Sequence, residues 1–579
     1  MRAEFLSLSV ALGDNVVMAS GQTGHGASPS VAIFGGGVGG LSVAQELLER
    51  GFKVTVYEKS HFGGKVRGMP VPGSGTDGRK DLPGQHGFHF FPGFYKNLPD
   101  TMKRIPSLAG KTVFEHIVWG KDELVAREND PSAVLPAGLT LSVEWIVETL
   151  KGLVALKHGI SFADLTFFAV RTLAYMATCN ERRVAELDEV TWWDYVGASG
   201  KSEEYQRLIA TMPSSLLVAV LPRVASTRTL GNAMIQMLQH GFRLGTTIDR
   251  LLDGPEEEVW VQPWVAHIHN LGGELRMPAE LIELDCDGAR ITGATILEGG
   301  VRRRIESDFY VCALPVDRAV KVLSPTIRRA APSLARIDEL RTGWMNGVQL
   351  FLSRQVPLVR GHVAFDDTPW AITSVSQAQF WPDFDWSKYG NGQSREAFSI
   401  IISNWDAPGV VVKKPAKLCS QQEIYTEVMA QMNASLAKLG EAILPSDVVC
   451  WFIDPDIVFP RGEAEADRNQ EKLYITTCGA WTSRPGPTTE IPNLFLAADW
   501  LQTDLDFASA EGTNQVSRQA ANAILDAAGS KARRSHVYRT KQPLLTAPLR
   551  ALDAVMFRLG LPALGYWGCT PLTPPPRIR

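Results

Sequence analysis

Three glycines near the start of the chain have the spacing of a dinucleotide site. Gly35, Gly37 and Gly40 form a G-x-G-x-x-G motif between the apolar run 31–34 and the segment 41–50, whose pattern is typical of a helix. Glycines there permit a tight turn, let the backbone approach a pyrophosphate, and let the helix pack closely on the strand. The start of the helix also offers unpaired amide groups to the phosphates. The motif therefore predicts a nucleotide site at this turn.

An acidic residue stands where such a site needs one. Glu58 follows the predicted strand 53–57 and lies 18 residues after Gly40. A carboxylate at the end of this strand can accept hydrogen bonds from both ribose hydroxyls of an adenosine and would repel a 2′-phosphate. The spacing favours a dinucleotide without that phosphate.

Features further along the chain favour FAD over NAD. Gly63-Gly64-Lys65 places a flexible backbone and a cation close after Glu58. Asp499 follows the apolar strand 494–498, where an aspartate can bind ribityl hydroxyls. The helix that begins near Glu511-Gly512 could direct its positive end at a flavin ring.

Together these motifs resemble the flavin amine oxidase and phytoene desaturase superfamily. The similarity is closest to the plant- and cyanobacterial-type carotene desaturases and the hydroxysqualene dehydroxylases. It spans about residues 31–530 and includes the stretch 87–98, the pair Gly272-Gly273 and the segment 493–512. The usual Ala-Gly-Asp of the family reads Ala497-Ala498-Asp499 here, and the tail beyond 530 has no counterpart that we can place.

The resemblance and the motifs give one set of candidate cofactor-binding residues. Leu281 belongs to it because it falls where the family has a residue whose backbone meets the adenine. The set is Gly35, Gly37, Val38, Gly39, Gly40, Glu58, Lys59, Gly63, Gly64, Lys65, Leu281, Asp499, Glu511 and Gly512.

Two titratable residues are the catalytic candidates. The resemblance places His89 near the flavin ring, where an imidazole could exchange a proton near neutral pH. It could equally hydrogen-bond to the backbone and only orient its loop. Asp504 follows Asp499 closely and could face the substrate, although loop acids are often solvated. The remaining histidines lack the spacing of metal ligands, so we expect no metal site.

The resemblance implies an FAD-dependent oxidoreductase that desaturates a hydrophobic isoprenoid or lipid-like substrate, with hydride transfer to flavin N5 and a quinone or oxygen as the electron acceptor. Three alternatives stay open. The substrate could be an amine, the reaction could be a redox-neutral isomerisation or dehydroxylation, or the chain could be a prenyl-lipid escort protein without flavin. The intact Glu58 and Asp499 regions argue against the escort protein.

The composition fits a large globular enzyme. The chain has 579 residues, 45% hydrophobic and 21% charged, with a net charge of −4, which argues against a nucleic-acid coat. Seven scattered cysteines without a C-x-x-C pair favour a reducing compartment. We therefore expect a cytoplasmic protein, peripheral to a membrane if its tail binds there.

The patterns predict an α/β protein whose Rossmann-like FAD-binding domain, a three-layer ββα arrangement, is assembled from discontinuous segments around an inserted α+β substrate domain. We assign 31–98, 255–345 and 485–530 to the first and 99–254 and 346–484 to the second. Residues 1–30 are expected to be a disordered leader.

Residues 531–579 form a basic tail with nine basic residues and one acid, Asp553, hence 9 − 1 = +8. Its segment 548–560 predicts a helix with Leu549, Leu552, Met556 and Leu559 on one face. Such a helix either lies on an anionic membrane surface or docks on the body with its charges solvated, and both possibilities stay open.

Overall fold

The computed structural model describes residues 28–139, 159–218, 220–241, 243–459 and 468–563, together with positions 149, 151, 152 and 154. Nearly all of the expected leader and the last sixteen residues of the tail therefore lie outside the described residues. Within the described part of the chain, none of the helices is both long and apolar enough to span a membrane.

The first sheet is parallel and is built from distant parts of the chain. Its five strands lie in the order β23-β13-β1-β2-β9, which are Leu494–Leu496, Phe309–Cys312, Ser30–Phe34, Lys53–Tyr57 and Glu274–Arg276. In β1, Val31 and Ile33 face one hydrophobic cluster, and Ala32 and Phe34 face another. Both faces of the strand are buried, which is why it is apolar at successive positions.

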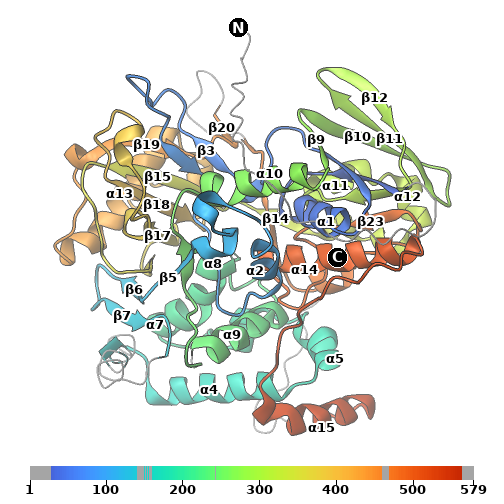
Figure 1. Ribbon diagram of the computed structural model, residues 1–579. Coiled ribbons are helices and arrows are strands. Elements are labelled where there is room, and N and C mark those ends of the chain that lie inside the picture. Colours follow the sequence, from blue (N-terminus) through green and yellow to red (C-terminus); the bar gives the residue numbers. More distant parts are fainter. Residues whose placement is uncertain are drawn as a thin grey trace.

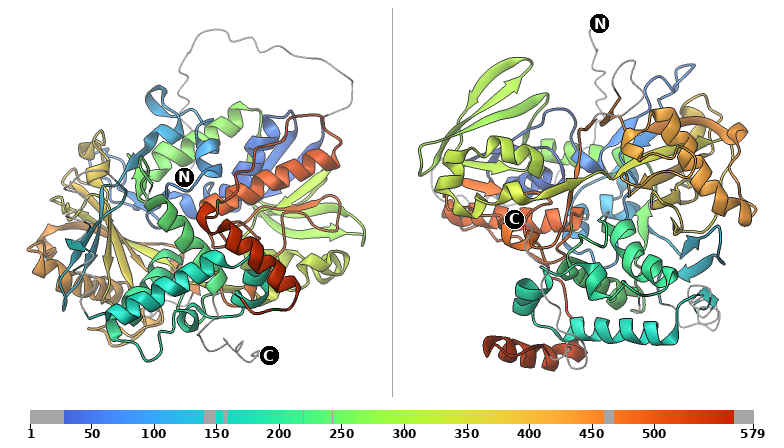
Figure 2. Two further views of the ribbon diagram at one scale, coloured as in Figure 1. Left: turned by 90° about the horizontal axis from the view of Figure 1, so that it is seen from below. Right: turned by 180° about the vertical axis from the view of Figure 1, so that it is seen from behind.

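Different layers cover the two faces of this sheet (Figures 1 and 2). Helices α1, α10 and α14 pack on one face and are Val38–Leu48, Gln262–Asn270 and Ala510–Ala527. The other face carries an antiparallel sheet, β10-β11-β12, and two helices, α11 and α12. These are Ala279–Cys286, Ile291–Glu298, Val301–Ile305, Val316–Val322 and Pro325–Ala330. The α/β class and the layered ββα arrangement predicted from the sequence are confirmed.

A second, larger sheet lies beside the first. Its order is β19-β15-β18-β17-β16-β6-β7, which are Val448–Ile453, Asn346–Leu352, Glu396–Ile402, Ile372–Ser376, His362–Phe365, Asp122–Ala126 and Ala133–Pro136. Helix α13, Gln421–Lys438, packs on it through Ile424, Val428 and Met432. The remaining short strands form four pairs. β3 (Gly68–Pro70) pairs with β4 (Pro83–Gln85), and β5 (Ile117–Trp119) pairs with β8 (Arg250–Leu252). β14 (Arg341–Gly343) pairs with β22 (Leu473–Ile475), and β20 (Ile457–Val458) pairs with β21 (Arg468–Asn469).

The remaining helices are α2 (Asn97–Met102), α4 (Phe162–Ala177), α5 (Asn180–Arg182), α6 (Trp192–Tyr195), α7 (Glu203–Tyr205), α8 (Met212–Val218), α9 (Thr227–Gly241) and α15 (Ala547–Arg558). In Figure 1, α2 and α8 lie near the middle of the molecule, and α4, α5, α9 and α15 lie in its lower part. The tail helix α15 packs against α4 and α5.

The tail helix is attached to the body by its acid and not by its apolar side. Asp553 is fully buried and pairs with buried Arg182. Leu549, Leu552 and Leu559 are exposed. Of the two possibilities left open, the helix is docked on the body, with Arg558 exposed. Its buried side carries the helix's one carboxylate, and its exposed side carries leucines.

Candidate functional site

One cavity of about 500 Å³ brings most of the candidate residues together. Of the fourteen cofactor candidates, eleven line it, and His89 lines it as well. The eleven are Gly35, Gly37, Val38, Gly39, Glu58, Lys59, Gly63, Gly64, Lys65, Leu281 and Asp499.

The glycines at the turn after β1 have different tasks. A Cβ on Gly39 would lie 1.9 Å from the carbonyl oxygen of Ala497, and one on Gly40 would lie 1.9 Å from that of Gly35. These two glycines therefore let α1 pack against the ends of the strands. A Cβ on Gly37 would meet no protein atom closer than 3.7 Å, so this glycine opens onto the cavity. A glycine with free space in front of it leaves room for a ligand's phosphates.

Glu58 is held in place by backbone amides. The N–H of Gly36 donates to its Oε2 (2.8 Å), and that of Ser60 donates to its Oε1 (2.9 Å). Its carboxylate is nearly buried and lines the cavity. Each oxygen keeps a further lone pair for another donor, such as a ribose hydroxyl.

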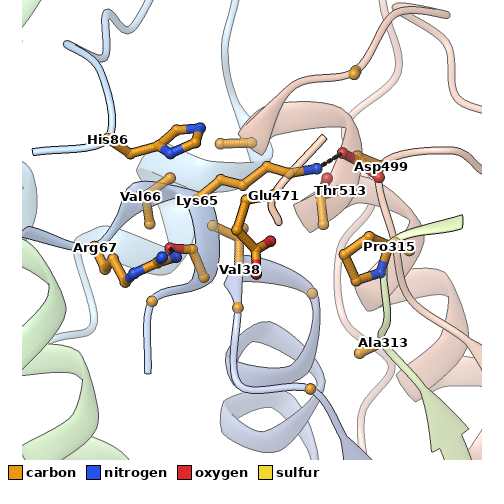
Figure 3. A pocket seen from close by; sticks show the side chains of 18 of the residues that line it. Val38, Lys65, Val66, Arg67, His86, Ala313, Pro315, Glu471, Asp499 and Thr513 are labelled. Atoms are coloured by element: carbon orange, nitrogen blue, oxygen red, sulfur yellow. Dashed lines mark hydrogen bonds and ion pairs between the residues drawn. The ribbon is translucent and has the colours of Figure 1, made fainter. Parts of the chain in front are cut away.

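Two ion pairs cross the cavity between distant segments. Nζ of Lys65 lies 3.3 Å from Oδ2 of Asp499, which comes shortly after the end of β23. Figure 3 shows the Lys65 side chain extending to this carboxylate. Nζ of Lys59 lies 3.2 Å from Glu471. The two lysines therefore place positive charge on the cavity wall and are neutralised by neighbouring acids.

Two candidates at the start of α14 do not line the cavity. Glu511 accepts hydrogen bonds from the backbone N–H groups of Lys96, Asn97 and Leu98 (2.8–2.9 Å), so it caps α2. The N–H of Gly512 donates to the Ser509 hydroxyl (3.1 Å). The expectation that these residues meet the cofactor is corrected, because their polar groups are used within the protein. The helix end contacts the cavity through Ser509, Ala510 and Thr513.

Asp504 does not line the cavity that His89 lines. Its carboxylate accepts from Gln515 (2.9 Å) and from the backbone N–H of Thr540 (3.2 Å), and it pairs with Arg539 (3.0 Å). It lines a second cavity that the tail encloses. The tail folds back over this loop and binds the carboxylate. The prediction that Asp504 faces the substrate is therefore corrected, because the residue lies outside the main cavity.

The imidazole of His89 contacts a carboxylate. The sequence left open a hydrogen bond to the backbone in its place. Nδ1 of the imidazole lies 2.8 Å from Oε1 of Glu256, which also accepts from the His89 backbone N–H (3.1 Å). Glu256 is nearly buried. The carboxylate favours the proton on Nδ1 and leaves Nε2 free.

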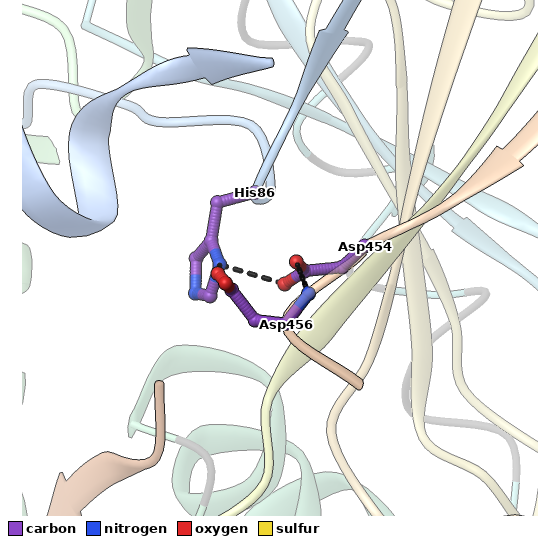
Figure 4. Close-up of side chains that lie close together, drawn as sticks. All are labelled: His86, Asp454 and Asp456. Carbon is purple, nitrogen blue, oxygen red and sulfur yellow. Dashed lines mark hydrogen bonds and ion pairs between the residues drawn. The ribbon is translucent and has the colours of Figure 1, made fainter. Parts of the chain in front are cut away.

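A second histidine on the cavity wall was not among the candidates. Nδ1 of His86 lies 2.7 Å from Oδ2 of Asp454 and 3.7 Å from that of Asp456 (Figure 4). Burial by itself lowers the pKa of His86, but the Asp454 carboxylate outweighs it and raises this pKa to about 9. The same pair lowers the pKa of Asp454 despite its burial. His86 therefore carries a proton at neutral pH.

The His86 cluster is electrically balanced. Arg67 pairs with Asp456 and donates to the carbonyl of Gly64 (2.7 Å), and Asn346 donates to Asp454 (2.6 Å). The two cations neutralise the two carboxylates, which leaves little attraction for a metal ion at this cluster. The sequence held one signal for it: Asp454 follows an apolar strand in the same way as Asp499 does.

A large part of the remaining cavity wall is aromatic or aliphatic, beside polar side chains such as Glu280, Arg318 and Lys321. The aromatic and aliphatic side chains come from the 88–95 loop, from η6 (Glu257–Val261), from α9 and from the edges of both sheets. They are Phe88, Phe90, Phe91, Phe94, Tyr95, Ala233, Met237, Trp260, Met345, Ile401, Leu473 and Phe507. Among these described residues none is a carboxylate, so this wall suits an apolar ligand.

Comparison with known proteins decides the family. The profile of flavin containing amine oxidoreductases matches residues 38–525, most of the chain. The chain belongs to this family. As a flavin containing amine oxidoreductase family member, it is a flavin-dependent oxidoreductase related to carotene desaturases, and the superfamily predicted from sequence is confirmed.

The names of several relatives refer to carotenoids or their precursors. The 15-cis-phytoene desaturase of Synechococcus elongatus is 23% identical over 525 residues, 87% of this chain and 98% of the relative. The zeta-carotene desaturase of Synechocystis is 24% identical and covers 86% and 97%. The carotenoid phi-ring synthase of Streptomyces griseus is 25% identical and covers 92% and 93%.

Solved structures show the same fold. Putrescine oxidase bound to putrescine is 12% identical with a TM-score of 0.56, over 86% of this chain and 99% of that one. Cyclohexylamine oxidase from Brevibacterium oxydans is 15% identical with a TM-score of 0.53, over 87% and 100%.

Proposed function

We propose that the protein is an FAD-dependent dehydrogenase that introduces double bonds into a hydrophobic isoprenoid. The observation that carries the proposal is the cavity itself. One end is lined by the glycine turn, Glu58 and Leu281, and the same cavity continues along a wall of aromatic and aliphatic side chains. A polar nucleotide and an apolar chain can thus lie in one continuous space.

The nucleotide end fits FAD. Gly37 opens onto the cavity, where a pyrophosphate can approach the start of α1. In this proposal Glu58 would bind the adenosine ribose and Asp499 the ribityl chain. Bound there, FAD would supply the two-electron acceptor that dehydrogenation requires.

The chain's own residues hold the substrate and exclude water. Phe88, Met237 and Ile401 contribute apolar surface that keeps a hydrocarbon dry and oriented. His89, with Nδ1 held by Glu256, presents Nε2 as a proton acceptor for the second hydrogen. The role of Glu256 is to fix the imidazole in this orientation.

An amine substrate is less compatible with the cavity. An alkylamine is protonated at neutral pH, so it must either bring its positive charge into the cavity or release a proton before it binds. The aromatic and aliphatic part of the described wall offers no carboxylate to an ammonium group, and Glu471 and Asp499, which also line the cavity, are paired with Lys59 and Lys65. A neutral hydrocarbon needs no such partner.

Product analysis tests the proposal and identifies the acceptor. The FAD-loaded protein is incubated with 15-cis-phytoene or with putrescine, each with a quinone and with oxygen in turn. We expect mass spectrometry to find a polyene that has lost two hydrogens, and no oxidised amine. Amine oxidation with peroxide release, and unchanged phytoene, would overturn the proposal.

A further inference from the structure

A second cavity, of about 880 Å³, lies between the C-terminal tail and the body of the protein. We call it the tail cavity. Its walls come from α5, from α9, from the loops 481–488 and 502–504, and from residues 539–554 of the tail, which runs from α14 to α15 in Figure 1. Most of the side chains that line it are polar, among them Gln502 and Thr540. The tail cavity therefore suits a water-soluble ligand better than a hydrocarbon.

The body contributes a buried cation, Arg183, to this wall. The side chain is 2% exposed, and it donates hydrogen bonds to the carbonyl of Tyr175 (2.8 Å) and to the Oδ1 of Asn232 (3.2 Å). A third bond goes to the Oε1 of Gln542 in the tail (3.1 Å). All these acceptors are neutral, and none of the described carboxylates forms an ion pair with this guanidinium. A buried cation that is bound only by neutral groups keeps its full charge, which is costly away from water.

The tail contributes a second cation, Arg550, which is half-buried. It donates to the carbonyls of Met176 (3.1 Å) and Pro543 (2.9 Å) and to the hydroxyl of Thr546. These acceptors are neutral as well, and Arg550 has no ion pair with any described residue. Burial and the neighbouring charge of Arg183 lower the pKa of Arg550.

The two guanidinium groups lie side by side. In the last turn of α4 they bind the carbonyls of two consecutive residues, Tyr175 and Met176. In the tail they bind the side chain of Gln542 and the carbonyl of the next residue, Pro543. The carbonyl end of a helix supplies roughly half a negative charge, so the two cations keep a surplus of about 1.5 positive charges.

The other charged side chains that line the tail cavity have partners of opposite charge. The pairs are Arg228 with Asp506, Arg539 with Asp504, and Glu181 with Arg558. The uncompensated positive charge of the wall is therefore that of Arg183 and Arg550.

We propose that the tail cavity binds a phosphate group between Arg183 and Arg550, either as inorganic phosphate or as the phosphate ester of a small polar molecule. A phosphate monoester carries about −1.5 to −2 charges at neutral pH, which matches the surplus, whereas one carboxylate would leave part of it. Guanidinium groups favour phosphate oxygens, and both keep N–H donors that the contacts above do not use. Because one arginine belongs to the body and the other to the tail, the bound phosphate would also strengthen the attachment of the tail.

Isothermal titration calorimetry of the FAD-loaded protein tests this site, since bound FAD keeps phosphate out of the glycine turn in the main cavity. The probes are inorganic phosphate, glycerol 3-phosphate and, at equal ionic strength, acetate. We expect both phosphates to bind, and acetate to bind at least about tenfold more weakly. Tighter binding of glycerol 3-phosphate would assign the site to an ester, and tighter binding of inorganic phosphate would assign it to the free ion.

Variants locate the binding. Arg550→Gln removes the half-buried cation and should bind phosphate at least about tenfold more weakly, and Arg183→Gln should weaken binding too. The matched control is Arg533→Gln, which removes an exposed charge from the same tail outside the cavity and should bind phosphate like the unaltered protein. The flavin content of each variant shows that it is folded.

Three results would overturn the proposal: no phosphate binding by the unaltered protein, equal binding by Arg550→Gln, or acetate binding as tight as that of phosphate. None of these results depends on which substrate the flavin oxidises, so the proposed function is tested separately.

Discussion

Nε of Arg182 donates to both carboxylate oxygens of Asp553, at 3.1 and 3.2 Å, and both side chains are buried. The two residues are 371 positions apart in the sequence. Their contact attaches the last helix to the body and fixes which of its sides faces outward. A polar contact, and not the apolar stripe, thus determines how the tail is presented.

Removal of Asp553 should destabilise the protein strongly. In Asp553→Ala the Arg182 guanidinium stays buried without its carboxylate, which costs about 3–5 kcal/mol for pairs of this kind. Urea unfolding measures the loss. Glu181→Gln, which alters an exposed partner of Arg558, is the control and should change the free energy of unfolding by less than about 0.5 kcal/mol. Equal stability of the two variants would contradict the structural role of Asp553.

The His86–Asp454 pair should make stability depend on pH in the alkaline range. An unperturbed histidine has a pKa of about 6.5, and that of His86 is raised to about 9. The folded protein therefore binds this proton more tightly than the unfolded chain. The stabilisation is complete below about pH 6.5 and is lost as the pH rises through about 9.

The measurement is the free energy of unfolding at several pH values for the unaltered protein and for His86→Gln. The difference between the two should shrink from pH 6.5 to pH 9.5. His61→Gln, a change at an exposed histidine, should leave the pH profile as it is. A constant difference between the unaltered protein and His86→Gln would mean that His86 is not held protonated by Asp454.

The glycines of the first turn should separate cofactor binding from folding. Gly37→Ala places a methyl group in the open cavity, so we expect a folded protein that retains much less flavin. Gly39→Ala would press a methyl group against the Ala497 carbonyl, so we expect a lower melting temperature. Differential scanning calorimetry and the flavin content of each purified protein distinguish these effects. Normal flavin retention by Gly37→Ala would contradict the placement of the pyrophosphate.

His89 should matter for turnover and not for cofactor content. His89→Ala removes the proposed proton acceptor, and general base catalysis is typically worth about 10²–10⁴ in rate. Glu256→Gln keeps the shape of the partner but weakens its hold on Nδ1, so its kcat should fall less. Stopped-flow kinetics with equal flavin occupancy give the comparison. A fully active His89→Ala variant would remove this residue from the mechanism.

The sequence predicted what is local and left open what depends on distant contacts. The strand, turn and helix around Gly35–Gly40 could be predicted because apolar runs and glycines lie next to one another. The contacts of Asp504 and Glu511 could not be predicted, because each carboxylate is bound by groups that are distant in sequence. Arg539 binds Asp504, and the backbone amides of residues 96–98 bind Glu511. Both are loop or helix-end acids near Asp499, and sequence alone gives them the same chance of facing the cofactor.

The His86–Asp454 pair escaped prediction for a related reason. The partners are 368 positions apart and meet where the segment after β4 contacts β15, through a hydrogen bond from the Gly347 N–H to the His86 carbonyl. The strand pairing of that sheet, such as β6 with β16, joins segments more than 200 positions apart. No local pattern specifies such register.

The most direct test of the proposed function is a single turnover without oxygen. The FAD-loaded protein is mixed anaerobically with 15-cis-phytoene in detergent, and the oxidised flavin absorbance is followed while the lipid is extracted for mass analysis. We expect one flavin to be reduced for each polyene that loses two hydrogens. Flavin that stays oxidised with phytoene but is reduced by putrescine would show that the substrate is an amine and not an isoprenoid.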